Sequence, residues 1–359
     1  MIRVAIIAAV LVPLFGCADG GAPTDTFDRR AMLEDIAMQA IMPAYALVQT
    51  DAITLGTAIE TLTQTPSEAT LIAAREAWVN TAMSWQRAQL FDFGPADAIT
   101  GTLGQSINTF PTSTAKVEAA IAAGDTSLLN FDRDARGLPA LDYLLFNGSV
   151  DQVVTTLAAS PMRRAYLRAV IRDVVAHVRR VHDAWNTTYY ADFQGRGGTD
   201  AGSGATQVFN AVNRGFELLK NFKIGIPAGL QAGQSAPAAM SVEAPCSGLS
   251  WRLAIAHQQA VRDLWTGRGA GGIVYTSFAS YILSRGGADL ERSTVQQFDA
   301  IEQAAAAIPL DVDLAALCAA QDPRVRAYYV ELQKLTRFIK SETSSLLGIS
   351  ITYASGDGD

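Results

Sequence analysis

The chain has 359 residues, 49% of them hydrophobic and 18% charged, and a formal net charge of −7 at pH 7. The apolar share is enough for packed cores and excludes a wholly disordered chain, while the length favours two domains over one. The acidic balance argues against a nucleic-acid-binding protein, because binding to phosphates needs a basic face. Three histidines and three cysteines are too few for a multi-metal or a disulfide-dense protein.

The N-terminus resembles a bacterial lipoprotein signal peptide, which we place at residues 1–16. Arg3 provides a basic start, and the apolar run of residues 4–15 is too short to span a bilayer, which takes roughly 20 residues. The run ends in a segment similar to a lipobox, Leu14-Phe15-Gly16-Cys17. An ordinary secretory signal followed by a chance cysteine is the alternative.

Lipidation of Cys17 would make residues 17–27 a lipid anchor and tether, so we expect an exported protein that is held on a membrane in the periplasm. Ala18, which follows the cysteine, favours the outer over the inner membrane by analogy with lipoprotein sorting. Export also means an oxidising compartment, in which Cys246 and Cys318 either form a disulfide or remain two buried thiols.

The rest of the chain has the pattern of helices joined by loops rich in Gly and Pro, without the sustained alternation that is typical of strands. Three helices have explicit starts with a cap residue followed by Pro, at Thr65, Ser160 and Asp322. These starts predict helices that end near Phe91, near Trp185 and at Gly348. Shorter helices are predicted near residues 28–63, 113–123, 139–146, 205–222, 249–266, 273–285, 289–307 and 311–320.

A glycine-rich segment, residues 194–204, is the best candidate for a linker between two domains. No strand precedes it and no Lys-Ser/Thr pair follows, so it does not fit a phosphate-binding loop. We predict an all-α fold of two related up-down four-helix-bundle-like halves that pack together, because the apolar stripes are wide. The first bundle would span residues 28–193, and the second, with a C-terminal tail, residues 205–359.

The histidines do not form a recognisable metal site. His177 and His182 are five residues apart on one predicted helix, about 140° around its axis, so they cannot bind one ion together. His257 is alone among apolar residues. The sequence also has neither a His-Glu-x-x-His run nor a Gly-x-Ser-x-Gly elbow, so zinc-peptidase and serine-hydrolase motifs are both missing.

Four segments in order carry a resemblance to a known family: residues 77–95, 136–146, 223–229 and 347–353. Their residues and spacing are similar to those of the imelysin-like family, also called peptidase family M75. The resemblance implies an all-α fold of two related four-helix bundles, a periplasmic or surface location, and a link to iron or haem acquisition. Founding members of the family were described as metallopeptidases, while many relatives are regarded as non-catalytic binders.

The chain departs from the family signature Gly-x-His-x-x-Glu, which falls on residues 137–142. Gly137 is kept, but Pro139 replaces the His and Asp142 replaces the Glu. A Glu common in the first motif of the family falls on Gln89. Since proline has no metal-binding side chain, a branch that kept the pocket and lost the metal chemistry fits better than a zinc peptidase.

The resemblance predicts a ligand pocket between the bundles, lined by Trp85, Gln89, Asp92, Arg136, Gly137, Pro139, Asp142, Lys223 and Ser247. We assign no catalytic residue. Asp142 is the best candidate for a metal ligand; alternatively, it is a carboxylate at a helix start with a local structural partner. Iron is the cofactor that the resemblance suggests, although nothing in the sequence requires it.

The sequence therefore predicts a lipid-anchored protein that binds a metal or small molecule between two helical bundles and serves iron or metal uptake. Its partners would be the membrane, through the anchor, and membrane proteins, but not nucleic acid. An M75-type metallopeptidase is one alternative function. A non-catalytic helical adaptor for membrane partners is the other.

Overall fold

A computed structural model of the chain describes residues 26–98, 101–128 and 132–351. Helices dominate this part of the chain, and its only strands, β1 (Asp97–Ala98) and β2 (Gly101–Thr102), form one short antiparallel pair. The predicted all-α fold is therefore confirmed. The predicted signal peptide, Cys17 and most of the tether lie outside the described residues.

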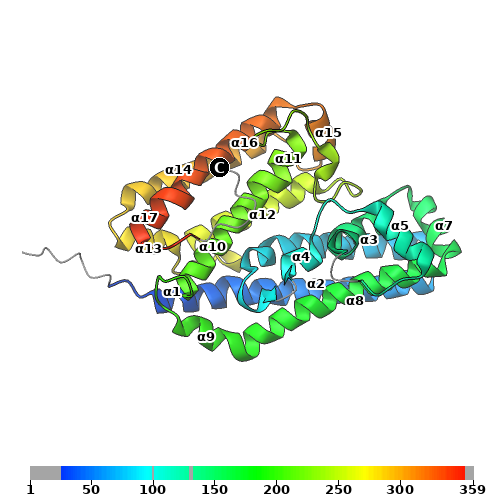
Figure 1. Ribbon diagram of the computed structural model, residues 1–359, viewed down its shortest axis with the longest axis horizontal. Coiled ribbons are helices and arrows are strands. Elements are labelled where there is room, and N and C mark those ends of the chain that lie inside the picture. The colour runs from blue at the N-terminus through cyan, green and yellow to red at the C-terminus, as the bar shows by residue number, and fades with distance from the viewer. Residues whose placement is uncertain (1–25, 99–100, 129–131, 352–359) are drawn as a thin grey trace, which may run out of the picture.

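Helices α1 to α9 form a lower layer in Figure 1, which we call the N-terminal layer. Among its three long helices, α2 (Met42–Gln64) packs along both α3 (Glu68–Ala88) and α8 (Pro161–Ala184). The shorter elements are α1 (Arg29–Ile36), η1 (Ala37–Ile41), η2 (Gln89–Phe91), η3 (Gly94–Ala96), α4 (Leu103–Ile107), α5 (Thr114–Ala123), η4 (Arg133–Ala135), α6 (Gly137–Phe146), α7 (Val150–Ala159), η5 (Trp185–Tyr189) and α9 (Tyr190–Gly195).

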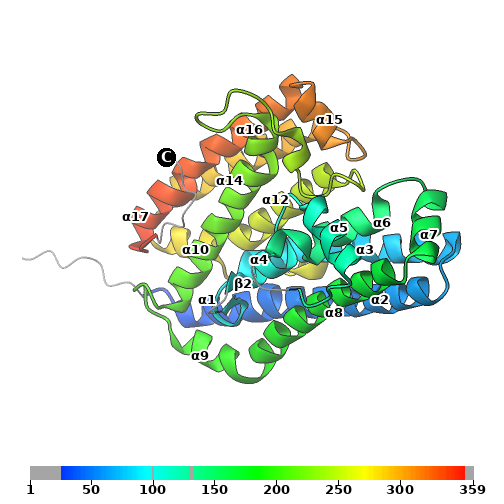
Figure 2. The same cartoon turned by 45° about the vertical axis from the view of Figure 1, so that its right-hand side comes forward.

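Helices α10 to α17 form the C-terminal layer, which lies above the first in both ribbon views (Figures 1 and 2). Helix α12 (Ser250–Thr266) packs directly against α3 and so joins the two layers. The other elements are α10 (Gly204–Glu217), η6 (Leu218–Gly225), α11 (Ile226–Ala228), η7 (Ala239–Ser241), η8 (Ala270–Gly272), α13 (Phe278–Ser284), α14 (Ala288–Ala306), α15 (Leu314–Ala319), α16 (Pro323–Thr336), η9 (Arg337–Thr343) and α17 (Ser344–Leu347).

Local capping explains two of the three predicted helix starts. The side chains of Ser160 and Asp322 accept hydrogen bonds from the backbones of α8 and α16, and each is followed by a proline that needs no helical partner. The third prediction, with Thr65 as the cap, is wrong. Ser67 caps α3 in a capping box with Thr70, because its extended backbone lets its hydroxyl meet the amide of Thr70.

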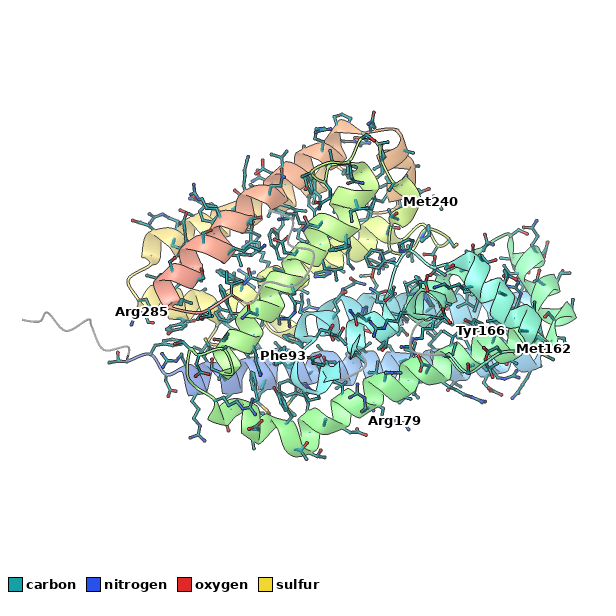
Figure 3. The ribbon with its side chains drawn as sticks, viewed as in Figure 1. Phe93, Met162, Tyr166, Arg179, Met240 and Arg285 are labelled. Carbon is teal, nitrogen blue, oxygen red and sulfur yellow. The ribbon has the colours of Figure 1, made fainter. Side chains whose placement is uncertain are left out.

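The core runs through both layers and contains all five tryptophans, each at most 1% exposed. Trp78 donates from its indole nitrogen to the carbonyl oxygen of Leu138 at 3.0 Å, which ties α3 to α6. Phe93, labelled in Figure 3, packs edge-on against Trp185 with 5.9 Å between ring centroids. This pair fixes the end of α8 against the segment that follows α3, within the N-terminal layer.

The continuous rod of α1, η1 and α2, residues 29–64, is long and apolar enough to cross a membrane by length and composition. However, 44% of its most apolar window is buried inside the protein, and residues such as Leu55 and Ile59 are fully covered. These properties are those of the core helix of a helical bundle.

Candidate functional site

The motif segment, residues 137–142, forms the first turns of α6. Gly137 has a positive φ of 76°, and a Cβ there would lie 2.2 Å from the carbonyl oxygen of Ile107, so only glycine fits. Pro139 is buried in the first turn, where a missing N–H costs nothing. The segment is therefore built as a helix start packed against the end of α4.

Asp142 connects the two layers through its carboxylate. Its oxygens accept hydrogen bonds from the backbone N–H groups of Cys246, at 2.9 Å, and Ser247, at 3.0 Å. Both donors belong to the segment Glu243–Ser247, which precedes α12 and which we call the interlayer segment. The structural partner of Asp142 is thus distant in sequence, not local as the alternative supposed.

The environment of Asp142 opposes its charge. Burial raises the pKa of the carboxyl to about 6, although the hydrogen bonds from Ser247 and Cys246 act in the opposite direction. At neutral pH the group is a carboxylate, and each oxygen already accepts one backbone hydrogen bond. A metal ion at this position would have to share or displace those bonds.

A buried polar cluster lies beside Asp142 and includes a complete ion pair. The ammonium of Lys223 is 2.6 Å from Oε2 of Glu243, and the two side chains are 1% and 4% exposed. Oε1 of Glu243 accepts from Gln86 at 3.0 Å and from Asn108 at 2.7 Å. Lys223 also donates to Oε1 of Gln86, which accepts a further bond from Gln89. We call these five residues the interlayer cluster.

Burial and the pairing with Glu243 act on Lys223 in opposite directions. Burial lowers its pKa, while Glu243 raises it through charge and a hydrogen bond. Taking both charges out of water is costly, so a buried pair of this kind is weak evidence for stability and better evidence for a specific role.

Four of the nine predicted pocket residues meet at this interface: Gln89, Asp142, Lys223 and Ser247. Gly137 and Pro139 form the start of α6. Trp85 is 1% exposed in the core, and its indole N–H has no hydrogen-bond partner among the described residues.

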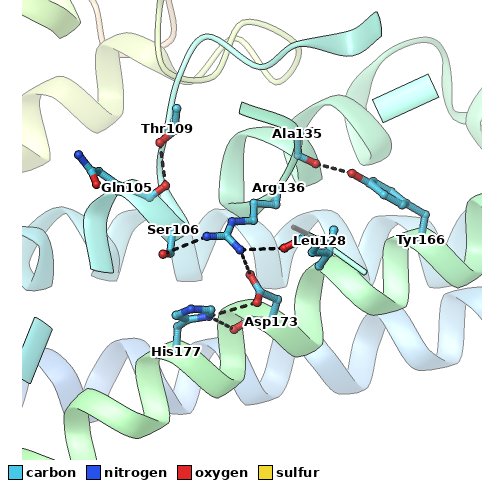
Figure 4. A network of polar contacts seen from close by, with 9 residues as sticks. All are labelled: Gln105, Ser106, Thr109, Leu128, Ala135, Arg136, Tyr166, Asp173 and His177. Atoms are coloured by element: carbon cyan, nitrogen blue, oxygen red, sulfur yellow. Dashed lines mark hydrogen bonds and ion pairs between the residues drawn. The ribbon is translucent and has the colours of Figure 1, made fainter. Parts of the chain in front are cut away.

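Arg136 was predicted to line the same pocket as Asp142, but it lies in a different network (Figure 4). It is the residue before α6, so its side chain turns toward α8, where its guanidinium is 3.9 Å from Asp173. It also donates to Oγ of Ser106 and to the carbonyl oxygen of Leu128. Asp173 in turn bonds to the imidazole of His177, which raises the pKa of that histidine.

Asp92 is also separate from the interlayer cluster. Its carboxylate accepts from the backbone N–H of Gly104 at 3.2 Å, at the start of α4, and its carbonyl oxygen accepts from Arg214. Burial raises its pKa, while Thr102, Gly104 and Arg214 oppose that shift. Asp92 therefore positions the β1–β2 turn region and α4.

Sequence reasoning missed three members of the site: Gln86, Asn108 and Glu243. Gln86 could have been found, because it lies one turn before Gln89 on the same helix and both are polar in an otherwise apolar stretch. Glu243 lies in a loop, where no periodicity distinguishes a buried carboxylate from an exposed one.

The histidines and cysteines form no metal centre in the described ranges. His257 is fully buried on α12, and burial, followed by the charge of Lys223, places its pKa well below the ordinary value. Cys246 and Cys318 are both free thiols, so the alternative in which they form a disulfide does not hold. Across residues 26–98, 101–128 and 132–351, no three His, Cys, Asp or Glu side chains are grouped to hold an ion.

The fold and this interface define the class of protein: an all-α protein in which side chains from one helical layer hold a segment of the other. A family model described as Imelysin (Peptidase_M75) matches residues 41–339. The chain therefore belongs to the imelysin family, and the resemblance expected from its motifs is confirmed.

Two solved structures share the fold. A putative iron-regulated protein A precursor from Parabacteroides distasonis has a TM-score of 0.72 at 17% identity, over 91% of this chain and 97% of that one. An imelysin-like protein from Psychrobacter arcticum has a TM-score of 0.71 at 20% identity, over 90% and 97%. At these identities the likeness concerns the fold alone.

One curated relative matches over a short stretch. Iron-regulated protein A from Synechococcus elongatus is 40% identical over 60 residues, which is 17% of this chain and 17% of that protein. The match thus spans about a sixth of the relative's length.

Proposed function

We propose that this chain is an exported, non-catalytic protein of iron or metal uptake that binds its ligand at the interface between the two layers. In this proposal a lipid on Cys17 anchors it to a membrane facing the periplasm, with the outer membrane favoured, and membrane proteins are its partners. Two relatives carry the name iron-regulated protein A, which supports the link to iron.

The observation that carries the proposal is the buried charged cluster around the interlayer segment. Lys223 and Glu243 form a nearly inaccessible ion pair, and Asp142 on α6 binds the backbone of the interlayer segment, with a pKa raised by burial to about 6. Strongly perturbed groups of this kind gather at functional sites, because stability alone does not favour them. Their oxygens are of the hard type that binds iron and other hard cations.

The chemistry of the motif disfavours a metallopeptidase. Pro139 offers no lone pair where the signature has a histidine, and Asp142 already accepts two backbone hydrogen bonds. A zinc peptidase needs three protein ligands and an open position for water. Binding through oxygen atoms at the interface does not need the lost imidazole.

The test is elemental analysis and calorimetric titration with iron and zinc, on the soluble form comprising residues 18–359. We expect stoichiometric iron, with the affinity reduced at least tenfold in Asp142→Ala. Asp311→Ala is the matched control, since Asp311 is an exposed carboxylate that is not part of the interlayer cluster. Circular dichroism establishes that each variant is folded.

Three outcomes would contradict the proposal in different ways. Absence of iron from the isolated protein and from the titration removes the metal-binding function. Chelator-sensitive cleavage of a peptide substrate would establish the metallopeptidase alternative. Co-purifying membrane proteins without any bound ligand would favour the helical adaptor.

A further inference from the structure

An apolar loop projects from the C-terminal layer between α12 and α13. We call residues 268–274 the apolar loop: residues 270–274 are all exposed, and residues 269–277 contain no charged side chain. Ile273 is 51% exposed and Val274 is 79% exposed, the largest fraction among the large hydrophobic side chains that the structure describes. Adjacent exposed aliphatic side chains with no charge beside them mark a contact surface more often than scattered ones do.

The backbone holds the apolar loop in a fixed shape. An antiparallel bridge joins its two sides, and the N–H of Gly269 donates to the carbonyl oxygen of Ile273 at 2.8 Å. At the tip, Gly271 and Gly272 have φ angles of 67° and 82°, which glycine adopts far more readily than other residues. A Cβ at either glycine would meet no atom within 4 Å. The tip is therefore a tight turn that points into open space.

The loop is fixed to the first residues of the described chain. Directly after it, the N–H of Thr276 donates to Asp35 on α1 at 3.0 Å. On α13, Tyr281 stacks on Phe27 with 4.5 Å between ring centroids, and its hydroxyl accepts from Arg29 at 3.1 Å. Figure 1 shows α1 and α13 side by side at one end of the molecule. The apolar loop and the N-terminal end of the described chain therefore lie near each other.

A lipid on Cys17 would hold this end of the molecule close to a membrane. The stretch from Cys17 to Thr26 reaches at most about 30 Å when it is fully extended. The loop lies against the helical rod that follows, since a Cβ on Gly269 would be 3.3 Å from the carbonyl oxygen of Gln39. Gln39 is only about 15 Å along that rod from Arg29. The loop is thus within reach of the bilayer whenever the anchor is in place.

We propose that the apolar loop inserts its tip into the bilayer beside the lipid anchor, with Ile273 and Val274 at the acyl chains and Arg268 among the phosphate groups. Aliphatic side chains gain free energy when they leave water for hydrocarbon, and an exposed arginine at the base of the loop suits anionic headgroups. The inference deepens the membrane association proposed above and rests on that anchor for its geometry. It orients the protein with α1 and α13 toward the lipid.

The experiment holds the chain on a membrane without its own lipid. A His tag in place of Cys17 binds residues 18–359, which include every described residue, to nickel-chelating lipids in vesicles of phosphatidylethanolamine and phosphatidylglycerol. The emission of Val274→Trp should shift to the blue and be quenched by lipids brominated on their acyl chains. The five native tryptophans, each at most 1% exposed, should not respond.

Met240→Trp is the matched control for the quenching. Met240 is 66% exposed and lies at the opposite end of the C-terminal layer from α13 (Figures 1 and 3). Its indole should remain in water on the same vesicles, with no shift and no quenching.

Two double variants measure what the loop adds to membrane affinity. Ile273→Ser/Val274→Ser should lower the apparent affinity for vesicles with few chelating lipids about tenfold, because insertion of the loop adds to the binding of the tag. Met240→Ser/Leu310→Ser is the control, since these two side chains are 66% and 56% exposed and lie outside the loop, and its affinity should not change. Circular dichroism establishes that all variants are folded.

Three results would overturn the inference. The first is emission of Val274→Trp that brominated lipids do not quench in the tethered chain, and the second is an equal loss of affinity in the two double variants. The third is a dimer that forms without vesicles and is abolished in Ile273→Ser/Val274→Ser, which would assign the loop to a second copy of the chain. Failure of the lipid anchor is a separate result, because the mass of the cellular protein reports whether Cys17 carries a lipid.

Discussion

At the scale of single residues, Asp142 decides what the start of α6 can do. The carboxylate is one methylene closer to its own helix, and in this position it accepts N–H groups from Cys246 and Ser247. The proline three residues earlier contributes only packing and a helix start. Through these hydrogen bonds Asp142 helps to hold the two layers together.

The charge of Asp142 makes the stability of the protein depend on pH. Its pKa is about 6 in the folded state, against an ordinary value of 3.8 that it regains on unfolding. The folded state therefore binds the proton more tightly, and this contribution is fully present below about pH 4 and lost as pH rises through 6. The shift corresponds to a loss of up to about 3 kcal/mol over that range.

The contribution of Asp142 to the free energy of unfolding can be measured by urea unfolding of the parent chain and of Asp142→Asn. The measurements are made at half-unit steps from pH 4 to 7. The Asn side chain does not titrate, so the stability of the parent relative to the variant should decline with increasing pH. A difference that is constant across the whole range would show that Asp142 has an ordinary pKa in the folded state.

At the scale of elements, the π-helical segment η6 explains how two lysines three residues apart serve different clusters. Lys220 pairs with Glu217 at 3.0 Å and bonds to Thr336, within the C-terminal layer. Lys223 pairs with Glu243 on the interlayer segment. Single turns of π-helix inside α-helices occur frequently at functional sites, where they change the direction of side chains.

The ion pair at the end of η6 gives a second stability prediction. Lys223→Met should destabilise the protein by about 3–5 kcal/mol, because it leaves Glu243 charged and buried without its cation. The double variant Lys223→Met/Glu243→Gln should lose much less than the sum of the single variants, since the neutral amide can still accept from Asn108. Additive losses in a double-mutant cycle would show that the pair is not coupled.

Helix caps could be predicted from the sequence more reliably than contacts between residues that are distant in the chain. Caps such as Ser160 and Asp322 act within three residues of the helix they start, so local sequence predicts them correctly. Ser67 was missed in favour of Thr65, because both can cap and only the backbone conformation distinguishes them. Helix identity was therefore predictable, while exact starts were less so.

Partners across the interface were much harder to predict. Arg136 was predicted to line the same pocket as Asp142, yet it contacts Asp173 on another helix. The donors to Asp142 are 104 and 105 residues away in a loop, and no local pattern indicates them. Recognition of the family placed Asp142, Gln89, Lys223 and Ser247 in one region, whereas the detailed geometry came only from the fold.

At the scale of the whole molecule, the two layers share one core instead of meeting through a polar surface. Trp85 and Leu90 lie on the N-terminal side of a hydrophobic cluster that continues into Trp265 and Phe216. Asp142 and Gln86 add hydrogen bonds between the layers within this covered region. Separation of the layers would expose apolar surface and leave charges unpaired.

Cleavage of the chain in the glycine-rich segment, residues 194–204, tests whether the two layers depend on each other for stability. Asp200 and Gly202 lie in an exposed turn between α9 and α10, where an inserted protease site should be cleaved in the folded protein. We expect the two fragments to remain together and to elute at the position of the intact chain in gel filtration. Elution of two separate folded fragments would show that each layer is stable alone.

The interlayer segment also determines an order of events as the chain folds. Apart from Lys223, which pairs with Glu243, the side chains that residues 243–247 contact in the N-terminal layer are those of Gln86, Asn108 and Asp142, more than 100 residues earlier. Contacts at such separations carry a large loop-closure entropy and form late. We therefore expect the N-terminal helices to assemble before this segment docks on them, with the docking seen as a late phase of refolding.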